Sequence, residues 1–396
     1  MMESILLQQL NESATLAMAR MARELSQQGY DIAGLSLGEP DFNTPDFVKA
    51  AAIKAIHDNI SHYPPVNGLP VLRKAISEKF ERDNGLRYSP EQIVVSTGAK
   101  QSIANTIYAL VNPGDEVILP GPFWVSYAEL VRLAGGIPVV LQSHIDTDYK
   151  VSAEQLRLAV NSKTKLIIYS SPCNPTGTVY SKKDLEEFAA IILTKPDLYV
   201  ISDEIYEHIN FTGTKFSIAS IDGMMERTIT VNGVSKAFAM TGWRIGYIGA
   251  PKWISDACVK MQGQITSGAN SIAQMAAAAA VSASPQVIAP MVETFKRRRD
   301  LVYEGLKGIM GMKVNLPEGA FYFFPDVRSY FGKKYGDKII SNADDLCLYL
   351  LTEHHVATVS GEAFGDMDCF RISYAASDEV LNKAIVRITK GLEALI

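Results

Sequence analysis

The sequence predicts an α/β protein whose larger part is a mostly parallel β-sheet covered by helices on both faces. Apolar runs typical of buried strands alternate with helical runs up to residue 284, and this alternation is characteristic of parallel strands joined by helical crossovers. After residue 285 a long helical run, an aromatic strand-like run and further helices follow. With 396 residues, the chain is also too long for one ordinary domain, so we expect a second, smaller α+β domain.

The individual elements follow from this pattern in chain order. The expected strands of the sheet are short apolar runs at 93–96, 116–119, 166–169, 199–202, 228–231 and 245–249. The expected helices of the larger part include 99–111, 124–133, 182–193 and 272–282. For the smaller part we expect a helix over 285–310, a strand at 319–324, a helix over 343–353 and a strand around Arg371.

Lys236 and Arg244 follow the expected strand at 228–231 and lie eight positions apart. A lysine amine can form an imine with an aldehyde, and an arginine can grip a phosphate with two parallel hydrogen bonds. Pyridoxal 5′-phosphate (PLP) carries both groups on one small molecule. On its own such a pair is more often two solvated surface charges, so the interpretation depends on the residues upstream.

Asp203 ends a buried strand-like run and is followed by Glu204 and Tyr206. Catalytic groups collect at the carboxyl ends of strands in open parallel sheets. A carboxylate there can pair with the pyridine nitrogen of PLP and keep it protonated, which makes the ring an electron sink. The simpler alternative is that Asp203 caps a following helix.

Two loops complete the pattern. Asn174 lies in a proline-punctuated loop, 172–177, after the expected strand at 166–169. Residues 98–100 form a small-residue turn between a strand and a helix, a geometry in which free backbone N–H groups point at an anion. Each loop considered alone could be an ordinary turn.

Taken together and in this order, these segments resemble the fold-type I PLP enzymes, and most closely the class I aminotransferases of the aspartate aminotransferase subgroup. The resemblance runs from residues 37–42 to residues 370–375. It implies PLP as cofactor, a seven-stranded sheet in the large domain, and amino acids and 2-oxo acids as substrates. It also implies a homodimer with active sites at the interface. The implied division is an N-terminal segment (1–45) that joins the small domain, a large PLP-binding domain (46–284) and a small domain (285–396).

The resemblance also assigns roles to the residues at matching positions. Lys236 is implied to be the Schiff-base residue and proton shuttle, and Asp203 the partner of the ring nitrogen. Tyr206 and Asn174 are implied to hydrogen-bond the ring hydroxylate, and Arg371 to bind the substrate α-carboxylate. The other implied cofactor contacts are Gly98, Ala99, Lys100, Ser235 and Arg244 at the phosphate, Trp124 on the ring face, and Tyr63 at the phosphate of the neighbouring subunit. The other implied substrate contacts are the backbone at Gly38 and the side chains of Trp124 and Asn174.

Lys100, Thr15 and Ser13 indicate the substrate class. In the subgroup that the chain resembles, a lysine in the phosphate loop and N-terminal Ser/Thr residues help to hold a distal carboxylate. We therefore expect a dicarboxylic substrate, with the α-amino group of aspartate passing to 2-oxoglutarate by a ping-pong mechanism. Thr15 and Ser13 could instead cap a helix, and Lys100 could serve the cofactor phosphate. The alternative functions are a glutamate/aspartate-prephenate aminotransferase, an aromatic or alanine aminotransferase, a β-lyase and, from another class, a PLP-sensing regulator.

Composition and charge narrow the remaining choices. The net charge of −5 gives no domain-wide positive field, which argues against nucleic-acid binding, and the basic cluster 296–299 is expected to be a solvated helix face. No metal-binding motif is found among the histidines and cysteines, so we expect no metal. Scattered cysteines indicate a reducing compartment, and neither a signal peptide nor a membrane-spanning run is evident, so we expect a cytoplasmic protein. The cysteines are Cys173, Cys258, Cys347 and Cys369.

Overall fold

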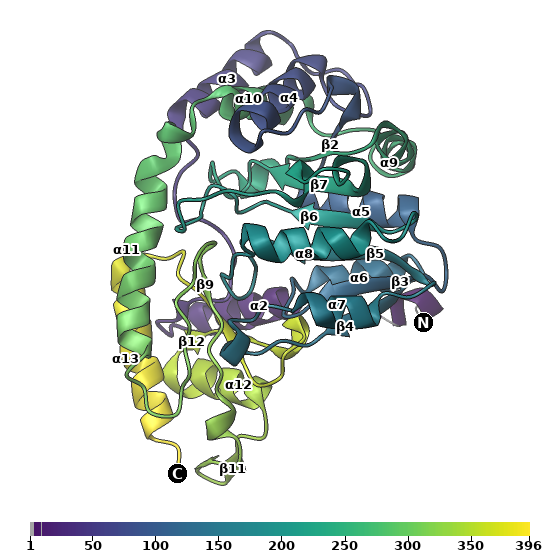
Figure 1. Cartoon of the computed structure of the whole chain (residues 1–396). Helices are drawn as coiled ribbons and strands as arrows, with labels where there is room; N and C mark the ends of the chain where they lie inside the picture. The colour runs from purple at the N-terminus through teal and green to yellow at the C-terminus, as the bar shows by residue number, and fades with distance from the viewer. Residues whose placement is uncertain (1–3, 9) are drawn as a thin grey trace.

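The computed structural model describes residues 4–8 and 10–396, and its centre is a seven-stranded sheet (Figure 1). The strands in spatial order are β2 (Ile93–Ser96), β8 (Gly246–Gly249), β7 (Thr228–Gly233), β6 (Tyr199–Asp203), β5 (Thr164–Ser170), β3 (Glu116–Pro120) and β4 (Ile137–Leu141). Strand β8 is antiparallel to β2 and β7, and the other neighbouring pairs in this sheet are parallel. The predicted α/β class and the seven-stranded sheet are therefore confirmed.

Helices cover both faces of this sheet because successive side chains of each strand point to opposite sides. Val117 and Leu166 pack into one apolar cluster, whereas their neighbours Ile118 and Ile167 belong to another cluster on the opposite face. The first cluster lies under α5 (Ala99–Leu110), α6 (Ser126–Leu133) and α9 (Lys252–Ile265). The second lies under α7 (Ala153–Ala159) and α8 (Lys182–Ile192). Strands buried on both faces explain the continuous apolar runs in the sequence.

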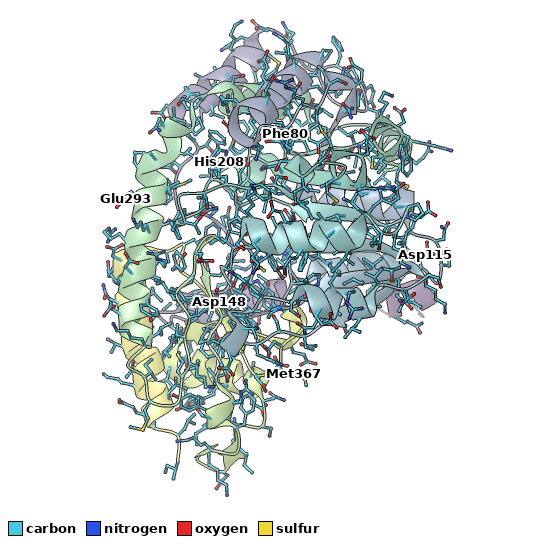
Figure 2. All side chains as sticks on the ribbon, in the orientation of Figure 1. Phe80, Asp115, Asp148, His208, Glu293 and Met367 are labelled. Atoms are coloured by element: carbon cyan, nitrogen blue, oxygen red, sulfur yellow. The ribbon has the colours of Figure 1, made fainter. Side chains whose placement is uncertain are left out.

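A third group of helices packs beyond the β2 edge of the sheet (Figure 1). It consists of α3 (Asp46–His57), α4 (Pro70–Asn84) and α10 (Ser271–Ser282), which pack against one another. Phe80 on α4, labelled in Figure 2, is fully buried against the rings of Tyr88 and Tyr247 at centroid distances of 5.2 and 5.7 Å. No single helix among the described residues is long and apolar enough to cross a membrane. The bent pair Ser271–Ser282 and Pro285–Leu306 has the length and composition for it only when the two segments are taken together.

The C-terminal part forms a smaller α+β unit. A three-stranded antiparallel sheet runs in the order β13 (Val359–Ser360), β14 (Phe370–Ser373) and β9 (Tyr322–Phe323). The surrounding helices are α11 (Ala289–Leu306), α12 (Ala343–His354) and α13 (Asp378–Glu393), and β10 (Lys334–Tyr335) pairs with β11 (Lys338–Ile339). The N-terminal segment, which carries α1 (Ile5–Gln8) and α2 (Ala14–Gln27), joins this part because β1 (Ala33–Gly34) pairs in parallel with β12 (Val356–Ala357).

The structure corrects three details of the prediction. The helix expected over 285–310 is a short 3₁₀ turn followed by α11, because Pro290 has no N–H and fits only the first turn of a helix. The helix expected over 124–133 begins two residues later, at Ser126. Strand β4 was not anticipated, since it lies at the sheet edge, is half-exposed and lacks a fully buried apolar run.

The basic cluster is only in part the solvated face that the sequence predicts, since Lys296 and Arg297 are exposed but Arg298 is not. Arg298 on α11 is buried, and its two terminal nitrogens donate to the carboxylate of Asp41 at 2.7 and 2.8 Å. Arg297 pairs with Asp378 at the start of α13. The prediction was wrong at Arg298 because the sequence alone does not reveal that Asp41, in the N-terminal segment, comes to lie beside α11.

Candidate active site

One cavity of about 350 Å³ lies at the carboxyl ends of the central parallel strands and is also lined by Tyr322 and Arg371 of the smaller unit. Strand β5 ends beside Asn174, β6 ends at Asp203, and β7 leads directly to Ser235 and Lys236. This edge of an open parallel sheet is where ligands bind in α/β proteins. The cavity is lined by all the predicted site residues except Gly98 and Tyr63, namely Ser13, Thr15, Gly38, Ala99, Lys100, Trp124, Asn174, Asp203, Tyr206, Ser235, Lys236, Arg244 and Arg371.

Asp203 is a buried carboxylate that does not cap a helix. Its Oδ2 accepts a hydrogen bond of 2.6 Å from the Tyr127 hydroxyl, and its Oδ1 accepts one from the Ile205 amide. Burial raises the pKa of the Asp203 carboxyl to about 6, although the bonds from Tyr127 and Ile205 and the charge of Lys236 act in the opposite direction. The carboxylate is therefore ionised at neutral pH and can hold a cationic N–H inside the cavity.

Lys236 presents its amine on the wall of the same cavity. Its Nζ donates to the backbone oxygen of Gly38 at 2.5 Å. Burial lowers the pKa of the Lys236 ammonium to about 8, the nearby charges of Arg371 and Arg244 act in the same direction, and Glu39 opposes them. A lysine with a lowered pKa contains more neutral amine at physiological pH and is therefore a better nucleophile.

The N-terminus of α5 and Arg244 form a compact anion site. The helix begins after Gly98, which has a φ of +83°. An added Cβ at Gly98 would overlap the Arg244 guanidinium, and one at Gly246 would overlap the Ala99 backbone nitrogen. Arg244 itself is exposed and donates to the Thr241 carbonyl at 2.9 Å. Backbone N–H groups and a guanidinium so close together suit a phosphate.

Arg371, on β14, is the most deeply buried arginine of the cavity. Its Nη1 donates to Asn174 Oδ1 at 2.9 Å and its Nη2 to the Ser36 carbonyl at 2.6 Å, while its buried Nε has no partner within the described residues. The guanidinium is held between the rings of Tyr322 and Phe364, 4.6 and 4.8 Å from their centroids. A fixed, desolvated guanidinium with unused donors is suited to bind a carboxylate.

Lys100, Thr15 and Ser13 line another part of the same cavity. The Lys100 ammonium lies 5.0 Å from the Trp124 ring, and burial and then the charge of Arg244 lower its pKa. Ser13 occupies the N-cap position of α2, yet its side chain makes no capping hydrogen bond. The hydroxyls at the start of α2 are therefore open to a ligand, as the dicarboxylate interpretation requires.

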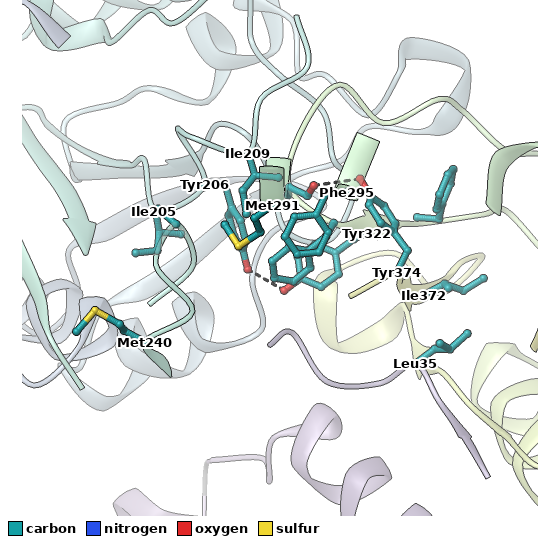
Figure 3. Packing of buried hydrophobic residues seen from close by; sticks show 14 of the residues in the cluster. Leu35, Ile205, Tyr206, Ile209, Met240, Met291, Phe295, Tyr322, Ile372 and Tyr374 are labelled. Atoms are coloured by element: carbon teal, nitrogen blue, oxygen red, sulfur yellow. Dashed lines mark hydrogen bonds between the residues drawn. The ribbon is translucent and has the colours of Figure 1, made fainter. Parts of the chain in front are cut away.

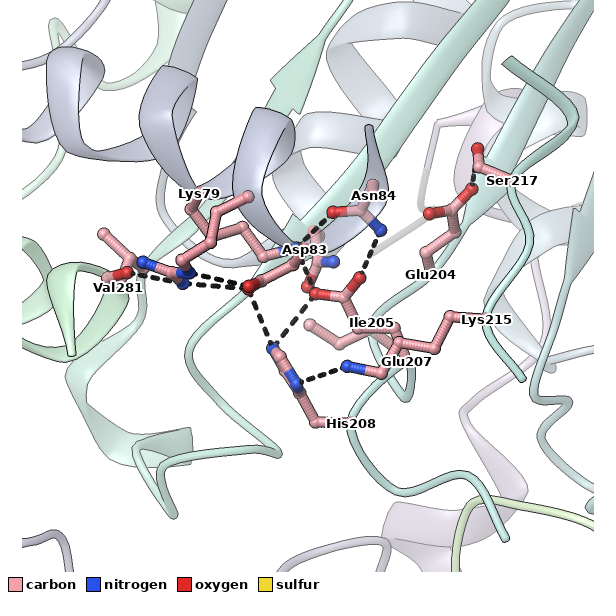
Figure 4. Close-up of polar contacts among 12 residues, drawn as sticks. Lys79, Asp83, Asn84, Glu204, Ile205, Glu207, His208, Lys215, Ser217 and Val281 are labelled. Carbon is pink, nitrogen blue, oxygen red and sulfur yellow. Dashed lines mark hydrogen bonds and ion pairs between the residues drawn. The ribbon is translucent and has the colours of Figure 1, made fainter. Parts of the chain in front are cut away.

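A buried polar network supports the turn that carries Asp203 and Tyr206 (Figure 4). Lys79 on α4 pairs with Glu207, and Asn84 bonds both side chains at 2.8 and 2.6 Å. Burial raises the pKa of the Glu207 carboxyl, but the charges of Lys79 and His208 outweigh it and leave the pKa well below its usual range. Asp83, Glu207 and His208 bring possible metal-ligand atoms within 4.8 Å of one another, but Lys79 already balances Glu207 and we assign no metal there.

Tyr63 does not reach the cavity of its own chain. Its side chain is 96% exposed, and it lines a separate hollow with residues 61–64 and 266–271. This arrangement brings the loop between α9 and α10 next to Tyr63. Tyr63 is therefore not part of the candidate active site of its own chain.

Four of the cavity residues that sequence reasoning did not assign to the site carry polar groups that make specific contacts there. They are Tyr127, Tyr322, Glu39 and Thr241, to which the sequence analysis gave no role in the site. Thr241 donates a hydrogen bond to the Glu39 carboxylate, which joins the N-terminal segment to the turn after Lys236. The position of Tyr127 was a usable signal, because it lies only three residues after Trp124.

The residues of the cavity fit PLP on their chemistry. The anion site at Gly98 and Arg244 suits a phosphate, and the buried Asp203 carboxylate suits a protonated pyridine nitrogen. The partly neutral amine of Lys236 suits an aldehyde. All three groups belong to one cavity whose volume, about 350 Å³, is in the range of small-molecule sites.

Comparison with known proteins identifies the family. The model of the family described as aminotransferase class I and II matches residues 30–388. An aspartate aminotransferase from Pinus pinaster is 48% identical over 97% of this chain and 79% of its own length. An aspartate/prephenate aminotransferase from Cereibacter sphaeroides is 46% identical over 96% of both chains.

Solved structures agree with these sequence matches. The crystal structure of an aspartate aminotransferase from Rhizobium meliloti superposes with a TM-score of 0.96 at 40% identity and covers 100% of both chains. That of the Thermus thermophilus aspartate aminotransferase with maleate gives a TM-score of 0.92 at 40% identity, over 99% of this chain and 100% of the other.

The chain belongs to the class I and II aminotransferase family. It is a transaminase that depends on PLP and exchanges amino groups between amino acids and 2-oxo acids. The family and the cofactor predicted from the sequence are thus confirmed.

Proposed function

We propose that this enzyme transfers the α-amino group of aspartate to 2-oxoglutarate, giving oxaloacetate and glutamate. The observation that carries the proposal is a cavity with two places for a carboxylate. Arg371 lies on one wall, and Lys100 lies on another with the hydroxyls of Thr15 and Ser13. Four- and five-carbon dicarboxylates present one carboxylate at each end of a short chain, so they can use both places. Alanine and phenylalanine can use only one.

The α-carboxylate would bind to Arg371, which keeps three of its five N–H donors after its bonds to Asn174 and Ser36. Because the guanidinium is held between two aromatic rings, it fixes the substrate in one orientation. Orientation of this kind contributes strongly to catalysis, since the reacting atoms no longer have to find each other.

Lys236, Asp203 and Tyr206 would carry the chemistry. When bound, PLP withdraws electrons from the substrate Cα, which makes loss of the Cα proton possible. Lys236 would hold the cofactor covalently, be displaced by the substrate amine and then move the proton. Asp203 would keep the ring nitrogen protonated, and Tyr206 and Asn174 would hydrogen-bond the ring hydroxylate.

Other residues would hold the cofactor in place. We propose that the α5 amides at Gly98 and Ala99, with Ser235 and Arg244, bind the phosphate, and that Trp124 stacks on the ring. Lys100 can serve the phosphate as well as the distal carboxylate, because its ammonium lies near both Trp124 and Arg244.

A second candidate function is prephenate transamination. It is supported by the names of relatives at 42–49% identity, several of which are called aspartate/prephenate aminotransferase. Prephenate also carries two carboxylates, so the same pair of sites could accept it. Aspartate and prephenate activity can therefore occur in one enzyme.

We propose that the protein is a homodimer with active sites at the interface. Tyr63, almost fully exposed and remote from its own cavity, would reach the phosphate bound by the partner. Exposed apolar side chains on α3, including Ile53 and Ile56, would be covered by the same contact. Sedimentation equilibrium should then give twice the 43.3 kDa chain mass, and a monomer with full activity would contradict the proposal.

Two further assignments accompany this proposal. We divide the chain into a PLP-binding domain (46–284) and a small domain (285–396 with 1–45), supported by the β1–β12 pairing that attaches the N-terminal segment. We also assign the enzyme to the cytoplasm, supported by its four unpaired cysteines, which are typical of a reducing compartment.

A panel of substrates tests the proposed activity. Aspartate, glutamate, alanine and phenylalanine would be offered as donors against 2-oxoglutarate, oxaloacetate and prephenate. We expect aspartate with 2-oxoglutarate to exceed alanine and phenylalanine clearly in kcat/KM. If aspartate were no better than those two, the substrate assignment would be wrong, although the enzyme would remain a transaminase.

A further inference from the structure

Tyr322, whose ring contacts the Arg371 guanidinium, also touches Tyr206 through its hydroxyl. It is on β9, it is 1% exposed, and it lines the cavity. Its hydroxyl lies 2.7 Å from the hydroxyl of Tyr206, and Figure 3 shows the two side chains meeting. In the antiparallel pair of β9 and β14, Tyr322 is opposite Ser373, two residues beyond Arg371. The small sheet therefore positions Tyr322 and Arg371 together.

The Tyr322 ring is held on three sides by groups of the site. The Arg371 guanidinium lies 4.6 Å from its centroid, and the Tyr206 ring meets it edge-on at 5.8 Å. A Cβ at Gly38 would overlap the Tyr322 hydroxyl, so glycine is required there, and the carbonyl of Gly38 accepts the bond from Lys236. A ring packed this tightly cannot turn away, and its hydroxyl is fixed against Tyr206.

We propose that Tyr322 is a positioning residue that acts through Tyr206: its hydroxyl donates to the Tyr206 oxygen and directs the Tyr206 proton to the ring hydroxylate of bound PLP. This inference rests on the proposed function, in which Tyr206 serves that hydroxylate. The bond to an anionic oxygen is the stronger one for the single Tyr206 proton. The Tyr206 oxygen is then left as an acceptor, and Tyr322 must be the donor.

Two features of the site favour a hydrogen bond in which Tyr322 is the donor and Tyr206 the acceptor. Consecutive hydrogen bonds strengthen one another in a low-dielectric interior, so a donor behind Tyr206 makes Tyr206 a better donor itself. Burial raises the pKa of the Tyr322 hydroxyl, while the charge of Arg371 lowers it in part. The charge of Arg371 lowers the pKa of the Tyr206 hydroxyl too, but the bond between the two hydroxyls lowers the pKa of Tyr322 and raises that of Tyr206, so Tyr322 is the better donor of the pair.

Tyr322→Phe in the holoenzyme tests the inference, because it removes one oxygen and keeps the ring. The measurement is a pH titration of the visible absorption of bound PLP, whose midpoint depends on how well the ring hydroxylate is stabilised. We expect the midpoint to rise by about 0.5–1 pH unit, the equivalent of one ordinary hydrogen bond. An unchanged or lower midpoint would overturn the inference. If Tyr322 instead accepted the Tyr206 proton, its removal would free that proton for the ring hydroxylate and lower the midpoint.

Two controls separate positioning from packing. Tyr374→Phe removes another fully buried hydroxyl of the same core, bonded to the Ala320 carbonyl at 3.0 Å and outside the cavity; its midpoint should match the unmodified enzyme. In a Tyr206→Phe background, Tyr322→Phe should add no further shift, because the residue acts only through Tyr206. The inference would be contradicted if Tyr322→Phe raised the midpoint by the same amount in the Tyr206→Phe background as in the unmodified enzyme. It would also be contradicted if Tyr374→Phe raised the midpoint as much as Tyr322→Phe does. If the unmodified protein showed no PLP absorption at all, the proposed function itself would fail.

Discussion

Arg371→Lys is the substitution that tests the proposed substrate geometry in most detail. In the structure the guanidinium uses two of its five N–H donors on Asn174 and Ser36 and lies between two aromatic rings. Lysine keeps the positive charge, but it has no planar fork and cannot stack in the same way. The substituted side chain can therefore offer the substrate carboxylate one hydrogen bond in place of two.

The size of the effect follows from that lost bond. A hydrogen bond to a charged group contributes about 1.5–3 kcal/mol, and about 1.4 kcal/mol corresponds to a factor of ten in rate. We therefore expect kcat/KM for aspartate to fall by about 10- to 150-fold. The protein should keep its fold, because a cation still occupies the site next to Asn174 and Ser36.

Steady-state assays with aspartate and 2-oxoglutarate measure this loss. Arg328→Lys is the matched control: Arg328 is exposed, pairs with Asp326 and Asp368 and does not line the cavity. It should leave kcat/KM unchanged. A kcat/KM for Arg371→Lys within about threefold of the unmodified enzyme would refute the fork geometry, since even the weakest charged hydrogen bond exceeds that factor.

Three further outcomes are expected. Lys100→Ala should lower kcat/KM for aspartate about tenfold or more, the value of one charged hydrogen bond, and leave alanine nearly unaffected; equal losses for both would remove Lys100 from substrate recognition. The rate at which PLP combines with the apoenzyme should rise up to the Lys236 pKa of about 8 and then level off, because only the neutral amine attacks; a stopped-flow rate still rising above pH 10 would contradict the lowered pKa. Lys79→Met should cost about 3–5 kcal/mol of unfolding free energy, because it removes the buried ammonium that balances the Glu207 carboxylate. Lys49→Met, in an exposed pair, should cost less than about 1 kcal/mol, and similar denaturant midpoints for the two variants would contradict this expectation.

The sequence was informative where chemistry is tied to the end of a buried strand. Asp203 is the last residue of β6, Asn174 follows β5 and Lys236 follows β7. Parallel strands bring these ends to one edge of the sheet. The family resemblance then added Arg371 and Trp124, which no strand pattern would have joined to that edge. The structure places all five on one cavity.

The sequence was uninformative for contacts between residues that lie far apart in the chain. Tyr127 and Asp203 are 76 positions apart, and Tyr206 and Tyr322 are 116 apart, so neither hydroxyl contact can be read from local pattern. Tyr322 sits in an aromatic strand-like run, where a core role is the ordinary interpretation. Arg298 was expected to be solvated because its partner Asp41 belongs to the N-terminal segment, far away in the sequence. Strand β4 lacked the fully buried run that marks its neighbours.

The covalent attachment of PLP to Lys236 underlies every proposed step of the reaction. Reduction of the holoenzyme with borohydride, followed by digestion and mass spectrometry, would fix the cofactor to the side chain that holds it. We expect a single pyridoxyl group on Lys236, and a Lys236→Met variant that neither binds PLP covalently nor turns over. A label on a different lysine, or a methionine variant that still transaminates aspartate, would contradict it.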